Sequence, residues 1–183
     1  RTSLRGLSLA ELVRRCTRLR PRARGTATQA SAFALCSTAK RIAALTTESR
    51  QLSSQIAQLV EATAPALLAE PGVGPISAAR ILIAWSHHGR FRSEAAFAML
   101  AGASPIPASS GQTVRHRLNR GGDRQLNRAL HTIALSRRAT HRPTRDYIER
   151  RIRDGKTTRE INRCLKRYLA RHLYRLLERS AMT

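Results

Sequence analysis

An apolar seam with heptad spacing runs along residues 30–63, and it restricts the fold of this chain more than any other feature. From the first seam residue the steps are 3, 4, 3, 4 and 3, through Ile42, Leu45, Ser49, Leu52, Ile56 and Leu59. So narrow a stripe is typical of a coiled coil rather than of a helix in a globular core. The seam predicts one long helix that pairs with a second copy or packs between domains. The alternative is one arm of a helical hairpin formed with the helix expected at residues 8–19.

The rest of the chain also favours helices. Helix-start signals, each a hydroxyl or carboxylate residue before an amphipathic stretch, stand at Ser8, Ser93, Asp123 and Thr157. Residues 113–118 alternate, but over too few positions to predict a strand. The expected fold class is all-α, a helical domain with a helix-hairpin-helix-like element and an irregular loop, preceded by the long coiled-coil helix. The expected domains are residues 1–64 and 65–183.

The chain is strongly basic, which restricts its partners. It has 34 lysine and arginine residues against 11 acidic ones, a formal charge of +23. Such an excess destabilises a compact state unless a polyanion neutralises it. Nucleic acid is the leading partner class and an anionic membrane surface the second. Arginine outnumbers lysine, which suits phosphate binding; a GC-rich genome would also favour arginine, but would not explain the total charge. No apolar run approaches the roughly 20 residues of a membrane span. With nucleic acid ranked first, no membrane partner is expected.

A glycine-containing turn, Glu70–Pro75 with the sequence EPGVGP, separates two expected helices. In a helix-hairpin-helix element such glycines let the backbone approach a phosphate, and the next helix directs free N–H groups toward it. Gly72 and Gly74 are therefore candidate nucleic-acid-binding residues. The alternative is a tight αα-hairpin whose glycines serve only the bend.

Residues 103–124, ASPIPASSGQTVRHRLNRGGDR, lack apolar periodicity and concentrate polar and basic side chains. They predict an ordered loop or short hairpin that offers a hydroxyl and several guanidinium groups to an anion. The candidate phosphate-binding arginines lie in this stretch and in the helix after it: Arg115, Arg117, Arg120, Arg124 and Arg128. The last expected helix has a further basic face, which fits a nucleic-acid groove better than a solvated surface: Arg159, Arg163, Lys166, Arg167, Arg171 and Arg175.

Metal catalysis has no visible basis in the sequence. Two-metal phosphoryl chemistry needs several converging carboxylates, whereas the 11 acidic residues are scattered among caps and helix faces. The three cysteines form no C-x-x-C pair, and His87-His88 has no third ligand at useful spacing. No metal site and no cofactor are therefore expected in this chain. A serine can instead attack phosphorus directly, provided that cations stabilise the charge developing on the phosphoryl oxygens.

Three blocks of the sequence together resemble the C-terminal transposase domain of the insertion-sequence 110/116/902 family. They are LLAEPGVGPISAARIL, FRSEAAFAMLAGASPIPASSGQT and HRLNRGGDRQLNRALH, in the family's order and spacing over residues 67–135. The preceding coiled coil and the tail to Leu177 also look like the family. The resemblance implies a bacterial DNA transposase or recombinase of the kind guided by a structured RNA of its own element. Its expected place is the cytoplasm, in association with the nucleoid.

The resemblance also implies particular residue roles. In that family the serine directly before the glycine of the S-G pair is the proposed nucleophile, which corresponds to Ser110; Ser109 is the adjacent alternative. Family members carry an N-terminal RNase H-like domain whose DEDD carboxylates bind magnesium, and this sequence has no match to it. We therefore expect a C-terminal piece or a truncated copy, inactive alone. Its expected partners are DNA, a guide RNA and a second copy bound through the coiled coil.

Two other classes of protein fit the same residues. A non-catalytic helical nucleic-acid-binding module needs only the basic residues and the hairpin. It predicts that Ser110 has no role, while arginine changes lower both the affinity and its salt dependence. A coiled-coil assembly protein whose charge is incidental predicts negligible, salt-insensitive nucleic-acid binding.

Overall fold

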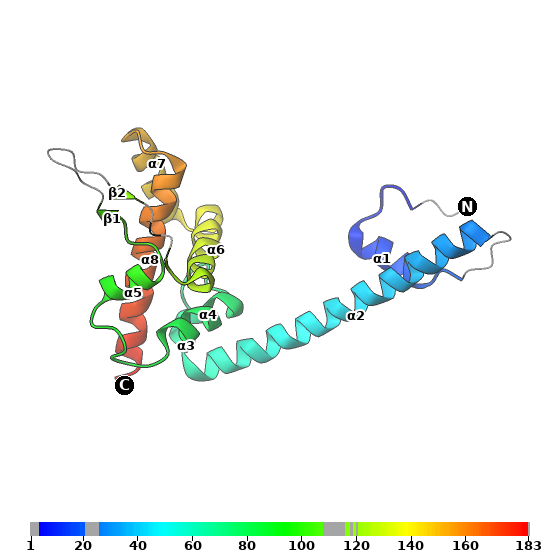
Figure 1. Cartoon of the computed structure of the whole chain (residues 1–183), viewed down its shortest axis with the longest axis horizontal. Helices are drawn as coiled ribbons and strands as arrows, with labels where there is room; N and C mark the ends of the chain where they lie inside the picture. Colours follow the sequence, from blue (N-terminus) through cyan, green and yellow to red (C-terminus); the bar gives the residue numbers. More distant parts are fainter. Residues whose placement is uncertain (1–3, 21–25, 108–115, 118, 120, 183) are drawn as a thin grey trace. The chain divides into compact units, whose positions relative to one another are not determined.

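The computed structural model describes residues 4–20, 26–107, 116–117, 119 and 121–182 (Figure 1). Almost all of the regular secondary structure in those residues is helical, which confirms the predicted all-α class. The chain divides into two compact units, Arg1–Gln55 and Ile56–Thr183. None of the described helices is both long and apolar enough to cross a membrane.

The first unit contains a short helix and most of a long one. α1 (Leu9–Thr17) begins after Ser8, whose hydroxyl accepts a hydrogen bond from the backbone N–H of Glu11 at 3.3 Å. The serine thereby satisfies one of the free donors at the helix start, as its place in the sequence predicts. α2 (Thr26–Thr63) is 38 residues long and confirms the single long helix.

The heptad seam of α2 is left uncovered within the first unit. α1 meets α2 near Cys16 and Cys36, which are buried, and the Cys36 thiol donates to the backbone oxygen of Thr17 at 3.7 Å. Beyond that contact Leu45 is 54% exposed and Leu52 52% exposed. A hairpin with α1 therefore does not account for the seam, and pairing with a second copy stays a prediction.

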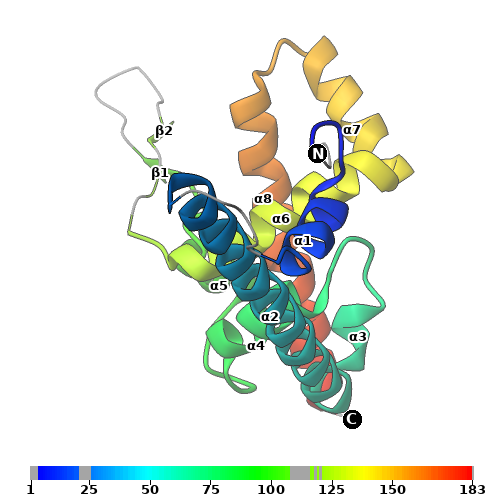
Figure 2. The same ribbon diagram turned by 90° about the vertical axis from the view of Figure 1, so that its right-hand side faces the viewer.

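The second unit is a helical bundle centred on α6 (Arg124–Thr140) and α8 (Thr158–Ser180). Figures 1 and 2 show α8 running through this unit with α5 and α6 beside it. α8 packs against α6 and three further helices, and α4 packs against α6. The bounds of these elements are α3 (Pro65–Leu68), α4 (Pro75–Trp85), α5 (Glu94–Leu100) and α7 (Arg142–Arg153).

The core of the second unit follows the predicted helical periodicity. Its largest fully buried side chains come from five helices: Leu67, Ile81, Phe97, Leu126, Leu130, Ile133 and Leu173. The end of α2 joins the same core through Val60, followed by Ala64. Most of this core is aliphatic, as a chain with only 4% aromatic residues requires, and Phe97, Trp85 and Tyr174 are buried in it as well.

A pair of very short strands interrupts the helices. β1 (Ile106–Pro107) and β2 (His116–Arg117) are antiparallel, with Ile106 opposite Arg117 and Pro107 opposite His116. Two residues on each side are too few to give a sequence signal, so the pair was not predictable from alternation. It brings together the two ends of segment 108–115. That segment contains Ser109, Ser110 and Arg115 and lies outside the described residues, as does Arg120.

Candidate nucleic-acid interface

A basic cleft of about 550 Å³ lies beside the strand pair of the second unit. Its walls come from residues 102–105 after α5, from β2, from the end of α7 and from the first turns of α8. The cationic side chains that line it are Arg117, Arg151, Lys156, Arg163 and Arg167. Strand β2 and the distant segment from the end of α7 into α8 thus bring positive charge to one hollow.

Most of the positive charge in the basic cleft has no carboxylate partner. Arg151 pairs with Asp154 at 3.0 Å. Within the described part of the chain, Arg117, Lys156, Arg163 and Arg167 form no ion pair. Unpaired cations converging on a hollow raise the local potential and attract an anion.

Glu160 lines the basic cleft, but its carboxylate is hydrogen-bonded to Thr157. Glu160 accepts hydrogen bonds from the backbone N–H and the hydroxyl of Thr157, both at 2.8 Å, while the Thr157 hydroxyl accepts from the backbone N–H of Glu160. This is the capping box predicted at the start of α8. The hydrogen bond from the Thr157 backbone lowers the pKa of the Glu160 carboxyl. The charges of Lys156 and Arg163 lower the pKa further, but the carboxylate is held at the helix start and forms no ion pair with either of them.

The C-terminal end of α5 fixes the base of the 103–124 stretch. The backbone oxygen of Leu100 accepts from the N–H of Asp123 at 2.7 Å, and that of Met99 from Asn119 Nδ2 at 3.3 Å. A helix leaves its last carbonyl groups without partners in the helix itself. The NRGGDR block supplies them here, so part of this motif serves the fold.

The paired glycines of that block have different surroundings. A Cβ on Gly122 would lie 2.4 Å from the nitrogen and 2.6 Å from the Cα of Gly102, which leaves no room for a side chain. A Cβ on Gly121 would meet only Asn119 Oδ1, at an ordinary 3.6 Å. Gly122 is thus required by the close approach of two backbone segments.

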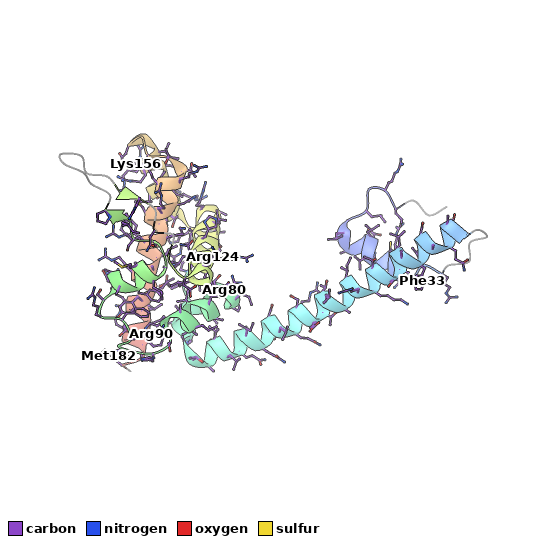
Figure 3. The ribbon with its side chains drawn as sticks, viewed as in Figure 1. Phe33, Arg80, Arg90, Arg124, Lys156 and Met182 are labelled. Atoms are coloured by element: carbon purple, nitrogen blue, oxygen red, sulfur yellow. The ribbon has the colours of Figure 1, made fainter. Side chains whose placement is uncertain are left out.

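The predicted phosphate-binding arginines separate into different places. Arg117 lines the basic cleft, whereas Arg124 and Arg128 are exposed on α6 and do not line it. Figure 3 labels Arg124 on α6 and Lys156 at the turn between α7 and α8, in different parts of the unit. Arg115 and Arg120 lie outside the described residues.

The basic face predicted for α8 is also divided. Arg163 and Arg167 line the basic cleft. Arg171 Nε donates to Glu94 Oε1 at 2.6 Å, and Arg175 Nε lies 3.2 Å from Glu94 Oε2. The later arginines therefore anchor the start of α5. Among the residues that sequence reasoning missed are Arg151 and Lys156, which reach the cleft only because the α7–α8 turn bends back.

The two candidate glycines of the EPGVGP turn differ as well. Gly72 has φ +76°, and a Cβ there would lie 3.1 Å from Arg137 Cγ and 3.2 Å from Ser136 Cβ. Gly74 caps the start of α4 with φ −97°, and a Cβ there would have no atom within 4 Å. Packing against α6 thus explains Gly72, as the αα-hairpin alternative supposes. A phosphate contact at either glycine stays a prediction.

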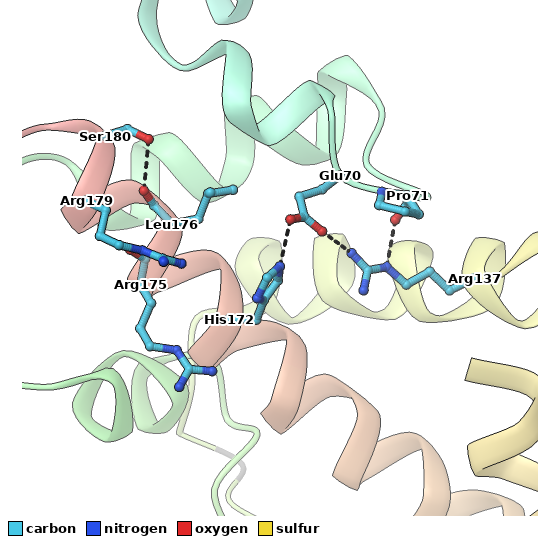
Figure 4. Close-up of polar contacts among 8 residues, drawn as sticks. All are labelled: Glu70, Pro71, Arg137, His172, Arg175, Leu176, Arg179 and Ser180. Atoms are coloured by element: carbon cyan, nitrogen blue, oxygen red, sulfur yellow. Dashed lines mark hydrogen bonds and ion pairs between the residues drawn. The ribbon is translucent and has the colours of Figure 1, made fainter. Parts of the chain in front are cut away.

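Glu70 holds that turn to two other helices (Figure 4). Its Oε2 lies 2.8 Å from Arg137 Nη2 and its Oε1 lies 2.7 Å from His172 Nε2, while Arg137 Nε donates to the backbone oxygen of Pro71 at 2.7 Å. Burial opposes ionisation of Glu70, but the hydrogen bonds and charges of His172 and Arg137 outweigh it and lower the pKa of the carboxyl. No local pattern marks this residue, because its partners are 67 and 102 positions away.

A metal centre has no support among the described residues. Within them, no group of three or more histidine, cysteine, aspartate or glutamate side chains converges. Glu70, Glu94 and Glu160 are each committed to ion pairs or a cap. The described carboxylates therefore do not fit the magnesium site that the family resemblance implies for another domain.

Comparison with known proteins identifies what the second unit is similar to. Residues 64–149, which contain the EPGVGP turn and the 103–124 stretch, match the model of the "Transposase IS116/IS110/IS902 family". The chain is also 35% identical over 124 residues to the "Insertion element IS110 uncharacterized 43.6 kDa protein" of Streptomyces coelicolor. That alignment covers 66% of this chain and 31% of the length of the Streptomyces protein. Both matches show that this part of the chain is similar to transposases of the IS116/IS110/IS902 family, and the chain spans about a third of the length of the Streptomyces protein.

Proposed function

We propose that the chain is part of a DNA transposase that holds DNA phosphates in the basic cleft and uses Ser110 as its nucleophile. One observation supports this above the others. β2, which follows the stretch that contains Ser110 in the sequence, contributes Arg117 to a hollow with four cationic side chains that form no ion pair in the described part of the chain. The family matches favour a transposase over other basic proteins.

The bonds formed and broken in the proposed reaction balance between the serine and the DNA. The Ser110 oxygen forms a bond to a DNA phosphorus, and the bond from that phosphorus to one sugar oxygen breaks. The serine proton ends on the released sugar hydroxyl, and the phosphoserine ester retains the bond energy for rejoining. Attack by another sugar hydroxyl reverses these changes on a new strand. Guanidinium groups of the cleft would stabilise the charge that develops on the phosphoryl oxygens.

A structured guide RNA is the second proposed partner. Its phosphates have the same chemistry as those of DNA, so the charge of +23 supports either polyanion. The family resemblance is what favours RNA in addition to DNA. Arg124 and Arg128, exposed on α6 away from the cleft lining, offer contacts for a second nucleic-acid segment.

A second copy of the chain is the proposed partner of the α2 seam. Exposed apolar side chains at heptad spacing support this pairing. A second copy would remove Leu45 and Leu52 from contact with water. Sedimentation should give a dimer or larger assembly. Leu45→Gln with Leu52→Gln should give a monomer, whereas Thr46→Gln with Gln51→Ala, off the seam, should not. A wild-type chain that is monomeric at all concentrations would contradict the pairing.

The nucleophile is tested by Ser110→Ala in the protein encoded by the whole reading frame, with Ser109→Ala as the matched control. Ser110→Ala should abolish strand exchange and the covalent protein–DNA product while DNA affinity stays within about twofold. Ser109→Ala should retain both. Exchange that survives Ser110→Ala would overturn the assignment, and loss confined to Ser109→Ala would move the role to the neighbour.

The same experiment separates the proposal from the non-catalytic module. A non-catalytic nucleic-acid-binding module would need only the cationic side chains of the basic cleft, so the cleft supports this second function as well. If neither serine variant affects exchange but cleft arginine variants lower DNA affinity, the chain is a binding module. The covalent product is therefore the deciding measurement.

A further inference from the structure

We infer that Asn127 and Lys166 are positioning residues that tie the backbone of Ala101, which leads into β1, to α8. The catalytic meaning of this inference rests on the proposed function, but the mechanical link does not. Asn127 lies on the first turns of α6 and Lys166 on α8, beside two arginines of the basic cleft. Neither residue lines the cleft itself.

The amide of Asn127 connects two helices through both of its polar atoms. Its Nδ2 donates to the backbone oxygen of Ala101 at 2.6 Å, and its Oδ1 accepts from Lys166 Nζ at 3.0 Å. Ala101 caps the C-terminal end of α5, five residues before β1. The contacts therefore form one chain from α8 through α6 to the backbone that leads into β1.

The direction of Lys166 supports this role. Its neighbours Arg163 and Arg167 line the cleft, whereas its own amine donates inward to Asn127. Burial, and then the nearby charge of Arg163, lower the pKa of the Lys166 amine. The solvation lost by a half-buried ammonium is not recovered by one neutral amide partner, so an apolar side chain would suit stability as well or better. What the lysine adds is a defined position for Asn127.

The Asn127–Lys166 hydrogen bond reaches α8, which the backbone contacts of the 103–124 stretch do not. The Leu100–Asp123 hydrogen bond and the close approach of Gly102 to Gly122 join the two ends of the stretch to each other. The Asn127–Lys166 hydrogen bond adds a polar connection to α8, beside the apolar packing of α5 and α6 on that helix. Since α8 supplies Arg163 and Arg167, the link fixes the backbone at Ala101, directly before cleft-lining residues 102–105, relative to these two arginines.

The mechanical part is tested on this chain by amide hydrogen exchange. Lys166→Met keeps the aliphatic stem and removes the amine, Asn127→Leu removes both hydrogen bonds without changing charge, and Gln125→Met is an exposed control on the same helix. In the first two variants the amides of Gly102 and Ala103, which donate to Met99 and Ala98, should exchange at least about tenfold faster.

Two results of that experiment would overturn the inference. One is wild-type exchange at Gly102 and Ala103 in both variants. The other is equal acceleration of the α8 core amides, at Leu169 and Leu173, because that would indicate a general loss of stability. Lys166→Met should also unfold at a temperature no lower than that of the wild type, which a merely stabilising contact would not allow.

The catalytic part is tested in the protein encoded by the whole reading frame. Asn127→Leu should slow formation of the covalent protein–DNA product at saturating DNA by at least about tenfold, with affinity within twofold. Lys166→Arg should restore part of the rate lost in Lys166→Met. If Ser110→Ala abolishes the product but Asn127→Leu forms it at the wild-type rate, the positioning role fails and the proposed function stands. If amide hydrogen exchange at Gly102 and Ala103 accelerates as expected but the protein binds no DNA, the proposed function fails and the Asn127–Lys166 link stands.

Discussion

The two glycine-containing segments of the second unit, residues 70–74 and 119–123, each have two glycines but differ in their electrostatic surroundings. In each turn one glycine is required by packing: Gly72 lies against α6, and Gly122 lies against Gly102. The first turn is held by an anion, Glu70, whose arginine partner is already bound. The second lies near the basic cleft, where Arg117, Arg163 and Arg167 have no carboxylate partner within the described residues.

This difference shows that a glycine motif alone does not locate a phosphate site. Glycine permits a close backbone approach, but the approaching group can be another helix as easily as a ligand. Surrounding charge decides between these possibilities, because only unpaired cations favour an anion strongly enough to compensate its lost hydration. On that criterion the second turn is the better candidate.

The largest expected effect tests the packing of the second turn. Gly122→Ala would place a Cβ 2.4 Å from a backbone nitrogen that has no space to move. We expect a loss of about 3 kcal/mol in the free energy of unfolding, at the upper end for an overpacked site. Urea denaturation measures it, and Gly121→Ala, with its nearest neighbour at 3.6 Å, is the matched control. Equal stability of the two variants would show that the backbone segments are not in contact.

The next effect tests the anion that holds the first turn. Glu70→Gln keeps the shape of the side chain but removes its charge, and should lower the free energy of unfolding by about 2 kcal/mol at pH 7. The folded pKa of Glu70 lies below its ordinary 4.5. Its contribution is therefore present above pH 4.5 and is lost as the pH falls through the folded pKa.

Denaturation of both proteins between pH 6 and pH 3 isolates that contribution. The gap in stability between wild type and Glu70→Gln should narrow as the pH falls below 4.5. A difference in the free energy of unfolding that does not change with pH would mean that folding does not lower the pKa of Glu70. It would also remove the electrostatic contrast between the two turns.

The sequence was most informative where the interactions are local. The Ser8 and Thr157 caps, the long helix α2 and the buried face of α6 follow from spacings of three and four residues, and the structure confirms each. The basic face predicted for α8 is only partly available to a ligand, because Glu94 binds Arg171 and Arg175. That pairing joins residues 77 positions apart and leaves no periodic signal.

The site was predictable only in part for the same reason. Arg117, Arg163 and Arg167 were singled out as basic residues near a loop or on a helix face, yet their convergence depends on how α7, α8 and β2 meet. Asn127, Lys166 and Glu70 act through partners in other helices. Ser110 was found by resemblance to a family motif and not by chemistry visible in its neighbours, so its role still depends on the mutational test.

The smallest expected effect distinguishes the two turns as phosphate sites directly. Arg163→Gln with Arg167→Gln should reduce the salt dependence of DNA binding, lowering the slope of log K against log salt by about 2, since each phosphate contact contributes about 0.9. Gly74→Ala should leave both the affinity and the slope unchanged. Its backbone angles suit alanine and the added Cβ meets no atom within 4 Å, so only a bound phosphate could be displaced. Titrations at several salt concentrations measure both variants. If Gly74→Ala weakens binding as much as the arginine pair does, the first turn also contacts the backbone of DNA, and charge around a glycine turn is not the deciding factor here.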